Sequence, residues 1–410
     1  MVASEIRALF AVASRPEIVG LAGGMPYVSA LPLDVVGDMF DDLVAKHGAV
    51  SLQYGSAQGD PRLREQICEV MALSGISAHA DDLVVTVGSQ GALDLIGRIF
   101  LDPGDIVLAE APSYVGALGV FASYQSEVVH VPTDDQGLQP EALRETLQRL
   151  AAAGKQPKLL YTVPNYHNPA GVTLTASRRA EVLEIARAAD VLILEDDPYG
   201  LLGFDQEPLR AMQADAPDGV VYLGSFSKTF APGLRIGWAL APQGVKDKLV
   251  LAAEAGILSH SAICQLAISK YLDNHAWRDQ IKSFRELYRE RRDAMLGTLD
   301  AVMPESCTWT RPAGGFYVWL TVPEGIDTKA MLARAIGARV AYVPGSAFFA
   351  DGALGARHMR LSYCFPEPDR IREGIRRLGG VIEEELEVHE TFGTGGTPAR
   401  GLDRPPPNLA

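Results

Sequence analysis

A lysine between phosphate-binding residue types is the strongest chemical signal in the chain. Lys228 closes the segment Gly224–Lys228 (GSFSK), and Arg235 follows seven residues later. Lysine amines form Schiff bases with carbonyl compounds, while serine hydroxyls and guanidinium groups bind phosphate oxygens. The pattern therefore indicates an amine held beside a phosphate. Taken alone, it fits equally well a solvated loop lysine with a packing arginine.

Three consecutive acids form the second signal. Glu195, Asp196 and Asp197 follow the apolar run Val191–Leu194 and precede Pro198-Tyr199. A carboxylate at a buried strand end needs a positive or proton-donating partner, because an unpaired buried charge is costly. A protonated pyridine nitrogen is one such partner. The alternative is that these acids cap the following turn or meet solvent, and at least one of the three is expected to do so.

Two loops of turn-forming residues give a third and a fourth signal. Residues 164–171 (PNYHNPAG) follow the apolar run Leu159–Val163 and alone predict a plain turn. Residues 88–92 (GSQGA) begin a helix, where small residues leave N–H groups free to bind an anion. Ser89 is also expected to be the N-cap of that helix.

An arginine within an apolar segment is the fifth signal. Arg360 begins the sequence RLSY in a strand-like stretch near the C-terminus. Such a residue is either one half of a core ion pair or a bidentate clamp for a carboxylate. The local sequence does not decide between them.

The elements that carry these residues alternate between β-rich and helical patterns. The predicted strands are Leu83–Val87, Ile106–Ala109, Val128–Val131, Leu159–Val163, Val191–Leu194, Val220–Leu223 and Ile236–Leu240. The predicted helices between them are Gly91–Phe100, Tyr114–Ser123, Pro140–Ala153 and Ser177–Ala189. Continuous apolar strands separated by helices indicate an α/β domain with a mostly parallel sheet. Its right-handed crossovers bring the signal-bearing loops to one edge.

The pattern changes after about residue 245. Helices are predicted at Ala276–Leu299, Lys329–Ile336 and Asp369–Val388, and short strands at Gly315–Val322, Ala341–Pro344 and His358–Tyr363. This favours a second, smaller α+β domain. The segment from Thr391 to Ala410 is rich in Gly and Pro, lacks apolar periodicity, and is expected to be disordered.

Composition excludes several classes of function. The chain has 410 residues, 37 of them basic and 51 acidic, giving a net charge of −14, which disfavours general nucleic-acid binding. No run reaches the ~18 apolar residues of a membrane span, and Glu5 and Arg7 interrupt any signal peptide. The four cysteines form no CxxC pair: Cys68, Cys264, Cys307 and Cys364. We expect a cytoplasmic protein with no disulfide framework and no metal site.

Taken together, the motifs resemble one family. LAGGMP (21–26), QYGSAQG (53–59), GSQGALDL, EAPSYVG, YTVPNYHNPAG, EDDPYG, GSFSKTFAPGLRIG and RLSY occur in the order found in class I/II aminotransferases of fold type I. These enzymes depend on pyridoxal 5′-phosphate. The resemblance covers about Ser4 to Val388 and is greatest to the 2-aminoadipate and kynurenine/aminoadipate branch. It implies a large domain with a mostly parallel mixed sheet and a smaller α+β domain.

The resemblance gives each signal a role. Lys228 would form the internal aldimine and then act as general base, and Asp196 would keep the pyridine nitrogen protonated. Tyr199 and Asn168 would hydrogen-bond the phenolic oxygen of the coenzyme, and Tyr114 would stack on its ring. The phosphate would be held by Ser89, Gln90, Ser225, Ser227 and Arg235, and by Tyr54 across a homodimer interface.

The same resemblance assigns the substrate contacts. Arg360 would clamp the α-carboxylate, with Asn168 beside it, and the backbone of Gly24 would touch the substrate. Arg7 lies where aminoadipate-type members read a distal carboxylate, although a surface helix arginine is an equally good interpretation. The implied divisions are a lid segment packing with the small domain (1–40), the large domain (41–245), the small domain (246–388) and the tail (389–410).

The resemblance thus implies a ping-pong transamination, with pyridoxamine 5′-phosphate formed during turnover. The donor would be an L-α-amino acid of the 2-aminoadipate/glutamate or aromatic type, and 2-oxoglutarate/glutamate would form one pair. Met25 in place of Leu and Ala170 in place of Thr leave the specificity open.

Three alternatives remain. Enzymes of this fold also act as lyases, decarboxylases or oxidases. Some bacterial transcription regulators carry an aminotransferase-like sensor domain after a helix-turn-helix, but the position of Lys228 and an N-terminus that begins at the lid argue against one. The third is a specialised-metabolism aminotransferase for an unusual amino acid such as an arylglycine.

Overall fold

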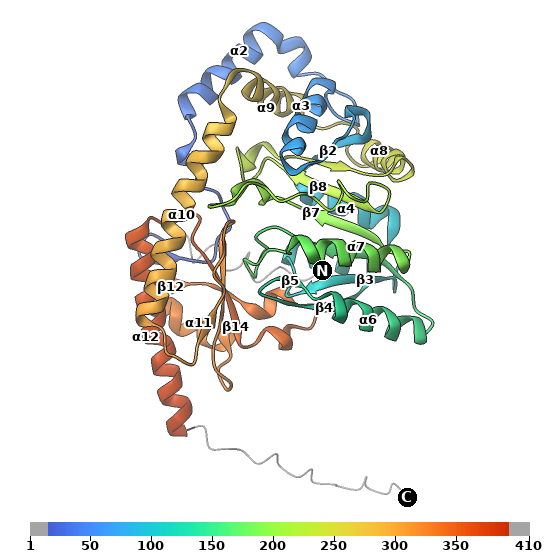
Figure 1. The fold of residues 1–410 in the computed structure, drawn as a ribbon. Coiled ribbons are helices and arrows are strands. Elements are labelled where there is room, and N and C mark those ends of the chain that lie inside the picture. The colour runs from blue at the N-terminus through green and yellow to red at the C-terminus, as the bar shows by residue number, and fades with distance from the viewer. Residues whose placement is uncertain (1–14, 393–410) are drawn as a thin grey trace, which may run out of the picture.

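A mixed sheet forms the centre of the large domain in the computed structural model, which describes residues 15–392 (Figure 1). Its strand order is β2-β9-β8-β7-β6-β3-β4, and β5 extends it at the β4 edge. The strands are β2 (Leu83–Val87), β3 (Ile106–Ala111), β4 (Glu127–Asp134), β5 (Gly137–Leu138), β6 (Pro157–Thr162), β7 (Leu192–Asp196), β8 (Val220–Ser225) and β9 (Ile236–Leu240). Strands β8, β7, β6, β3 and β4 are mutually parallel, and β9 is antiparallel to both β8 and β2.

All seven predicted runs are strands, with ends that differ by up to three residues. They are mostly apolar because both faces of the sheet are covered. Along β6, Leu160 belongs to the core cluster on the side of helices α6 and α7, whereas Leu159 and Tyr161 belong to the cluster on the opposite face. The covering helices are α4 (Gly88–Phe100), α5 (Val115–Ser123), α6 (Pro140–Ala152) and α7 (Ala176–Ala188).

The small domain is built on a four-stranded antiparallel sheet of order β10-β11-β14-β13. Its strands are β10 (Thr308–Trp309), β11 (Tyr317–Thr321), β13 (Val343–Pro344) and β14 (His358–Ser362). The helices beside it are α10 (Trp277–Val302), α11 (Thr328–Gly337) and α12 (Pro368–Phe392). Strand β1 (Val19–Gly20) pairs in parallel with β12 (Val340–Ala341), which ties the N-terminal segment to this domain.

Two helices after residue 245 do not pack where the sequence division places them. Helix α8 (Gln243–Ile257) lies against α4 and β2, and α9 (Ala262–Asn274) lies against α2 (Leu33–Ser51) and α3 (Pro61–Met71). Both helices therefore pack with the large domain, although the division at residue 245 assigns them to the small domain (246–388). Helix α12 also continues to Phe392, four residues into the segment 389–410 assigned to the tail.

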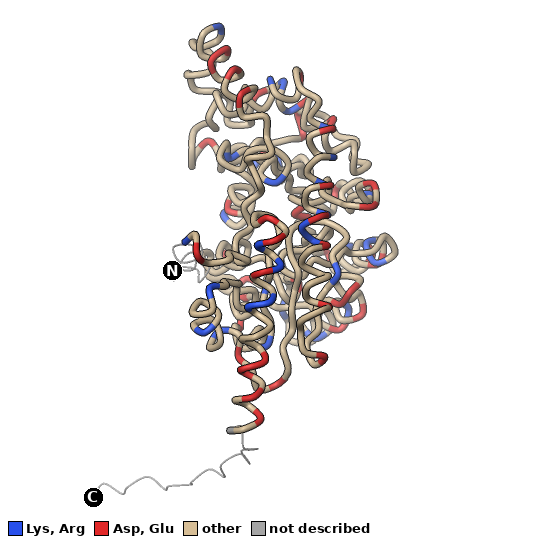
Figure 2. The backbone as a smooth tube through the Cα atoms, turned by 90° about the vertical axis from the view of Figure 1, so that its left-hand side faces the viewer, with Lys and Arg blue, Asp and Glu red and all other residues tan. Residues whose placement is uncertain are grey.

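Charge is distributed along the whole chain rather than gathered at one element. Figure 2 shows acidic and basic residues interspersed, with an acidic stretch toward the C-terminal end of α12, where the sequence has Glu383, Glu384 and Glu385. Within residues 15–392, no helix combines the length and the apolar character needed to cross a membrane.

Candidate active site between the two sheets

A pocket of about 280 Å³ collects most of the residues singled out in the sequence. It lies where loops at the carboxyl edge of the large sheet meet the small domain and the turn at Gly24. Among its lining residues are Gly24, Ser89, Gln90, Tyr114, Asn168, Asp196, Tyr199, Ser225, Ser227, Lys228, Arg235 and Arg360. The topology explains this gathering, because parallel strands end at a common edge.

Lys228 follows strand β8 and points its amine across the pocket. Its Nζ donates a hydrogen bond to the carbonyl oxygen of Gly24 at 3.0 Å. Burial, with a contribution from the positive charges of Arg360 and Arg235, lowers the pKa of Lys228 from 10.5 to about 8. A larger share of the amine is therefore neutral, and nucleophilic, near neutral pH.

Asp196 ends strand β7 and presents one unpaired carboxylate oxygen. Its Oδ2 accepts a hydrogen bond from the Tyr161 hydroxyl at 2.8 Å, while its buried Oδ1 has no partner. The side chain is 2% exposed, and burial raises its pKa from 3.8 to about 7. Such an oxygen calls for a cationic N–H donor in the pocket.

The two neighbouring acids are used by the fold itself. Glu195 accepts hydrogen bonds from the backbone N–H groups of Met212 and Gln213 at 2.9 and 2.8 Å. Asp197 accepts one from the N–H of Gly200 at 2.8 Å, as expected of an acid that caps a turn. Of the three acids, Asp196 is the one that lines the pocket.

An anion-binding corner forms where α4 begins. No side chain caps this helix, so the expected N-cap by Ser89 is wrong, and the first N–H groups stay open to the pocket. The Arg235 guanidinium lies over Gly88, where a Cβ would be 2.5 Å from its Nη2. Arg235 Nη1 also lies 3.4 Å from Ser227 Oγ, and the Ser225 hydroxyl donates to the same oxygen at 2.8 Å. Together these groups are suited to a phosphate.

Gln90 and Tyr114 form one wall of the pocket. The Tyr114 hydroxyl donates to Gln90 Oε1 at 3.2 Å, and Gln90 Nε2 donates to the carbonyl of Gly116 at 3.1 Å. The Gln90 side chain therefore orients Tyr114 instead of pointing both of its polar atoms at an anion. Burial raises the pKa of Tyr114 to about 12, so it presents a neutral ring to whatever lies in the pocket.

Arg360 comes from the small domain and is 3% exposed. Its Nη1 donates to Asn168 Oδ1 at 2.9 Å and its Nη2 donates to the carbonyl of Ala22 at 2.7 Å. Its buried Nε has no partner, and no ion pair within residues 15–392 neutralises it. The structure therefore disfavours a core ion pair and leaves N–H groups for a carboxylate from outside.

Tyr317 is a pocket residue that the sequence patterns did not single out. It begins β11 and looked like any apolar residue of the predicted strand Gly315–Val322. Its hydroxyl lies 3.4 Å from that of Tyr199, and its ring lies under the Arg360 guanidinium at 4.2 Å. The pair of aromatic residues after two glycines (Gly314-Gly315-Phe316-Tyr317) was the available signal, since glycines let a backbone approach closely.

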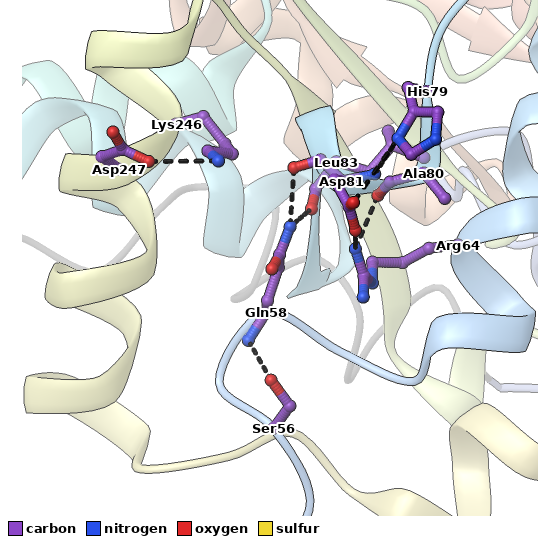
Figure 3. A network of polar contacts seen from close by, with 9 residues as sticks. All are labelled: Ser56, Gln58, Arg64, His79, Ala80, Asp81, Leu83, Lys246 and Asp247. Atoms are coloured by element: carbon purple, nitrogen blue, oxygen red, sulfur yellow. Dashed lines mark hydrogen bonds and ion pairs between the residues drawn. The ribbon is translucent and has the colours of Figure 1, made fainter.

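One predicted site residue lies outside the pocket, and another is not described. Tyr54 is 78% exposed and does not line this pocket. Its loop is pinned to the sheet, because Gln58 Nε2 donates to the carbonyls of Asp81 and Leu83 and the Gln58 carbonyl accepts from Val85 N (Figure 3). Arg7 falls outside the described residues.

These features fit pyridoxal phosphate. The unpaired Asp196 Oδ1 suits a protonated pyridine nitrogen, the Ser225–Arg235 corner suits a phosphate, and Lys228 offers a reactive amine between them. Tyr114 supplies an aromatic face for the ring. The chemistry of the side chains, rather than any one motif, accounts for the fit.

Comparisons with known proteins identify the family. The family model for aminotransferase class I and II matches residues 17–378. The chain is 43% identical to aromatic-amino-acid aminotransferase 1 of Thermococcus litoralis, covering 94% of this chain and 93% of the relative. It is 35% identical to 2-aminoadipate transaminase of Thermus thermophilus, covering 94% and 95%.

A solved structure extends the likeness to three dimensions. The kynurenine aminotransferase of Pyrococcus horikoshii, in complex with PMP, superposes with a TM-score of 0.90 at 42% identity, covering 94% of this chain and 96% of that one. PMP is the amino form of the same coenzyme. The chain belongs to the class I and II aminotransferases and is a pyridoxal-phosphate-dependent enzyme of fold type I.

Proposed function

We propose that this aminotransferase moves the amino group between an aromatic or 2-aminoadipate/glutamate-like L-α-amino acid and a 2-oxo acid, with 2-oxoglutarate/glutamate as one pair. The observation that carries the proposal is the buried, unneutralised Arg360 in the same pocket as Lys228. A carboxylate bound there places the adjacent α-carbon within the reach of the lysine. Only substrates with that arrangement of groups use both side chains.

Each side chain has a distinct task. Arg360 donates two of its N–H groups to Asn168 and to the carbonyl of Ala22. Its Nε–H and remaining N–H groups bind the α-carboxylate. Pyridoxal phosphate, when bound, supplies the electron sink that stabilises negative charge at the substrate α-carbon. Lys228, with its lowered pKa, accepts the proton that leaves this carbon and holds it at Nζ. Asp196, through its unpaired Oδ1, would keep the pyridine nitrogen of the coenzyme protonated and therefore positively charged.

The described walls of the pocket favour an aromatic donor. The basic residues that line the pocket within 15–392 are Lys228, Arg235 and Arg360, and the proposal already gives each of them a partner. The remaining walls include Met25 and the rings of Tyr114 and Tyr317. A distal carboxylate, as in glutamate, therefore needs a cation from elsewhere, for which Arg7 is the candidate. Two similar enzymes, the aromatic-amino-acid aminotransferase and the kynurenine aminotransferase described above, support the same preference.

A half-reaction screen tests the substrate class. The loaded enzyme is mixed with single amino acids (phenylalanine, kynurenine, 2-aminoadipate, glutamate, arginine, phenylglycine), and loss of the visible coenzyme band with formation of pyridoxamine phosphate is followed. We expect glutamate and at least one aromatic amino acid to react. Reaction with dicarboxylic amino acids alone contradicts the aromatic preference, and reaction with phenylglycine alone supports a specialised role.

Arg7→Ala provides the matched variant for the distal carboxylate. If Arg7 binds this group, the half-reactions of glutamate and 2-aminoadipate slow while that of phenylalanine is unchanged. An equal loss for all three would make Arg7 a structural residue.

We also infer a two-fold dimer in which Tyr54 completes the partner's site. Large apolar side chains are exposed in the segment that leads to Tyr54, in α8 and just after it, and Gly55 N donates a hydrogen bond to Ser259 Oγ in the loop that follows α8. They are Val50, Leu52, Leu251, Ile257 and Leu258, each 44–69% exposed. A patch of this kind indicates an interface. Mixing inactive Lys228→Ala with Tyr54→Ala chains, under conditions that exchange subunits, tests it, because each hybrid would hold one fully intact site and regain activity.

A further inference from the structure

We propose that Tyr317 is a positioning residue: once the Tyr199 hydroxyl donates to the phenolic oxygen of the coenzyme instead of to Tyr317, the Tyr317 hydroxyl rotates to donate to the Tyr199 oxygen and strengthens that bond. The proposal rests on the role suggested for Tyr199 and adds a second phenol behind it. It concerns the hydroxyl of Tyr317, which separates this residue from a phenylalanine at the same place.

The position of the Tyr317 hydroxyl is tightly determined. The residue is 2% exposed and begins β11, opposite Ser362 of the paired strand β14. A Cβ at Gly24 would collide with the Tyr317 hydroxyl oxygen, so the chain at Gly24 packs directly on it. The ring is edge-on to Tyr199, with centroids 6.0 Å apart. The hydroxyl is thus held against the N-terminal turn and cannot swing away from Tyr199.

Tyr199 is the one hydrogen-bond partner of this hydroxyl among residues 15–392: the Tyr199 hydroxyl donates to the Tyr317 oxygen 3.4 Å away. Burial raises the pKa of both phenols, so each carries its proton across the neutral pH range. When Tyr199 gives its proton to the oxygen of the coenzyme, its own oxygen is left as an acceptor. Tyr317 is placed to donate to that oxygen.

The direction of this chain has a chemical consequence. A phenol that accepts a hydrogen bond becomes a better donor, because successive hydrogen bonds polarise one another. The Tyr199 bond then favours the phenolate form of the coenzyme more strongly. The pH at which the visible band of the loaded enzyme changes form is therefore lower with the Tyr317 hydroxyl than without it.

The ring of Tyr317 has a separate task. Its centroid lies 4.2 Å from the Arg360 guanidinium, and the ring stabilises the guanidinium by a cation–π contact. Removal of the hydroxyl alone leaves this support in place, whereas removal of the ring does not. Tyr317→Phe and Tyr317→Leu therefore separate the two contributions.

The test is a pH titration of the visible band in loaded wild-type, Tyr317→Phe, Tyr199→Phe and the double variant, after each is shown to bind one coenzyme per chain. We expect Tyr317→Phe to raise the midpoint by about 0.3–0.5 pH unit, a two- to threefold change in proton concentration. Tyr199→Phe raises it further, and the double variant matches Tyr199→Phe because the second phenol then has nothing to act on.

Several outcomes would overturn the proposal. An unchanged midpoint in Tyr317→Phe refutes it while leaving Tyr199 in its role, and an unchanged midpoint in Tyr199→Phe removes that role as well. A full Tyr317→Phe shift in the Tyr199→Phe background shows another route of action. As a second readout, the affinity for unreactive maleate should be unchanged in Tyr317→Phe and weakened in Tyr317→Leu. Equal weakening in both would assign the hydroxyl to Arg360 instead.

Discussion

The lowered pKa of Lys228 makes a quantitative prediction about capture of the coenzyme. Burial and two nearby guanidinium groups lower this pKa from 10.5 to about 8. At about pH 7.5 roughly a quarter of the amine is then neutral, against roughly one part in a thousand for an ordinary lysine, a gain of about 200-fold. Because the neutral amine is the nucleophile, the rate of capture should stop rising once the pH exceeds about 8.

The assay mixes coenzyme-free enzyme with pyridoxal phosphate from pH 6 to 10.5 and follows the visible band as it forms. Nα-acetyl-lysine in the same buffers serves as the reference, since dividing by its rate cancels the titrations of the coenzyme itself. Below pH 8 both amines gain with pH and the ratio stays level. Above pH 8 the ratio should fall about tenfold per pH unit, because the free lysine keeps gaining neutral amine up to pH 10.5.

A ratio that stays level up to pH 10 would refute the reasoning, because Lys228 would then titrate like an exposed lysine. Arg360→Met gives a matched test of cause. This change removes one of the nearby positive charges, so the break in the ratio should move to higher pH. An unmoved break would remove Arg360 as a cause and leave burial and Arg235, and Lys228→Ala should form no such band at any pH.

Three further outcomes follow from buried residues. Gly24→Ala should lower kcat/KM at least tenfold with the coenzyme still bound, since its Cβ would meet the Tyr317 hydroxyl and push the turn away. Burial lowers the pKa of His260 from 6.5 to about 4, so below pH 6.5 the unfolded chain binds a proton that the native chain does not. The free energy of unfolding, measured in urea, should therefore fall by up to roughly 3 kcal/mol more in the wild type than in His260→Leu between pH 6.5 and 4. Glu110→Gln should cost about 1–3 kcal/mol of unfolding free energy, because its amide would face the His167 Nε2 that now lies 3.1 Å from the carboxylate.

The large sheet was predictable because its evidence is local. Each strand is a short apolar run, and the acids or the lysine that follow it mark its end. The run Val220–Leu223 placed Lys228 at the carboxyl edge, where the structure has it. The loops that carry Asn168 and Asp196 reach the same edge for the same reason.

What the sequence could not supply depends on distant contacts. Tyr317 reads as one more aromatic in a buried strand, and only the meeting of β11 with the turn at Gly24 makes it part of the pocket. Glu110 and His167 are similar, because a buried carboxylate and a ring from different loops pair only after β3 and β6 align. The position of α8 and α9 against the large sheet likewise follows from packing, which periodicity does not encode.

The site itself depends on interactions between parts of the chain that are far apart in sequence. Lys228 reaches the turn at Gly24, Arg360 of the small domain reaches Asn168 of the large one, and Tyr199 meets Tyr317. Because each of these bonds joins separate parts of the fold, a shift of the small domain changes all three together. Substitutions in β11 or β14 should therefore alter both substrate binding and the state of the coenzyme. Substitutions confined to the large sheet should alter one of these two properties without the other.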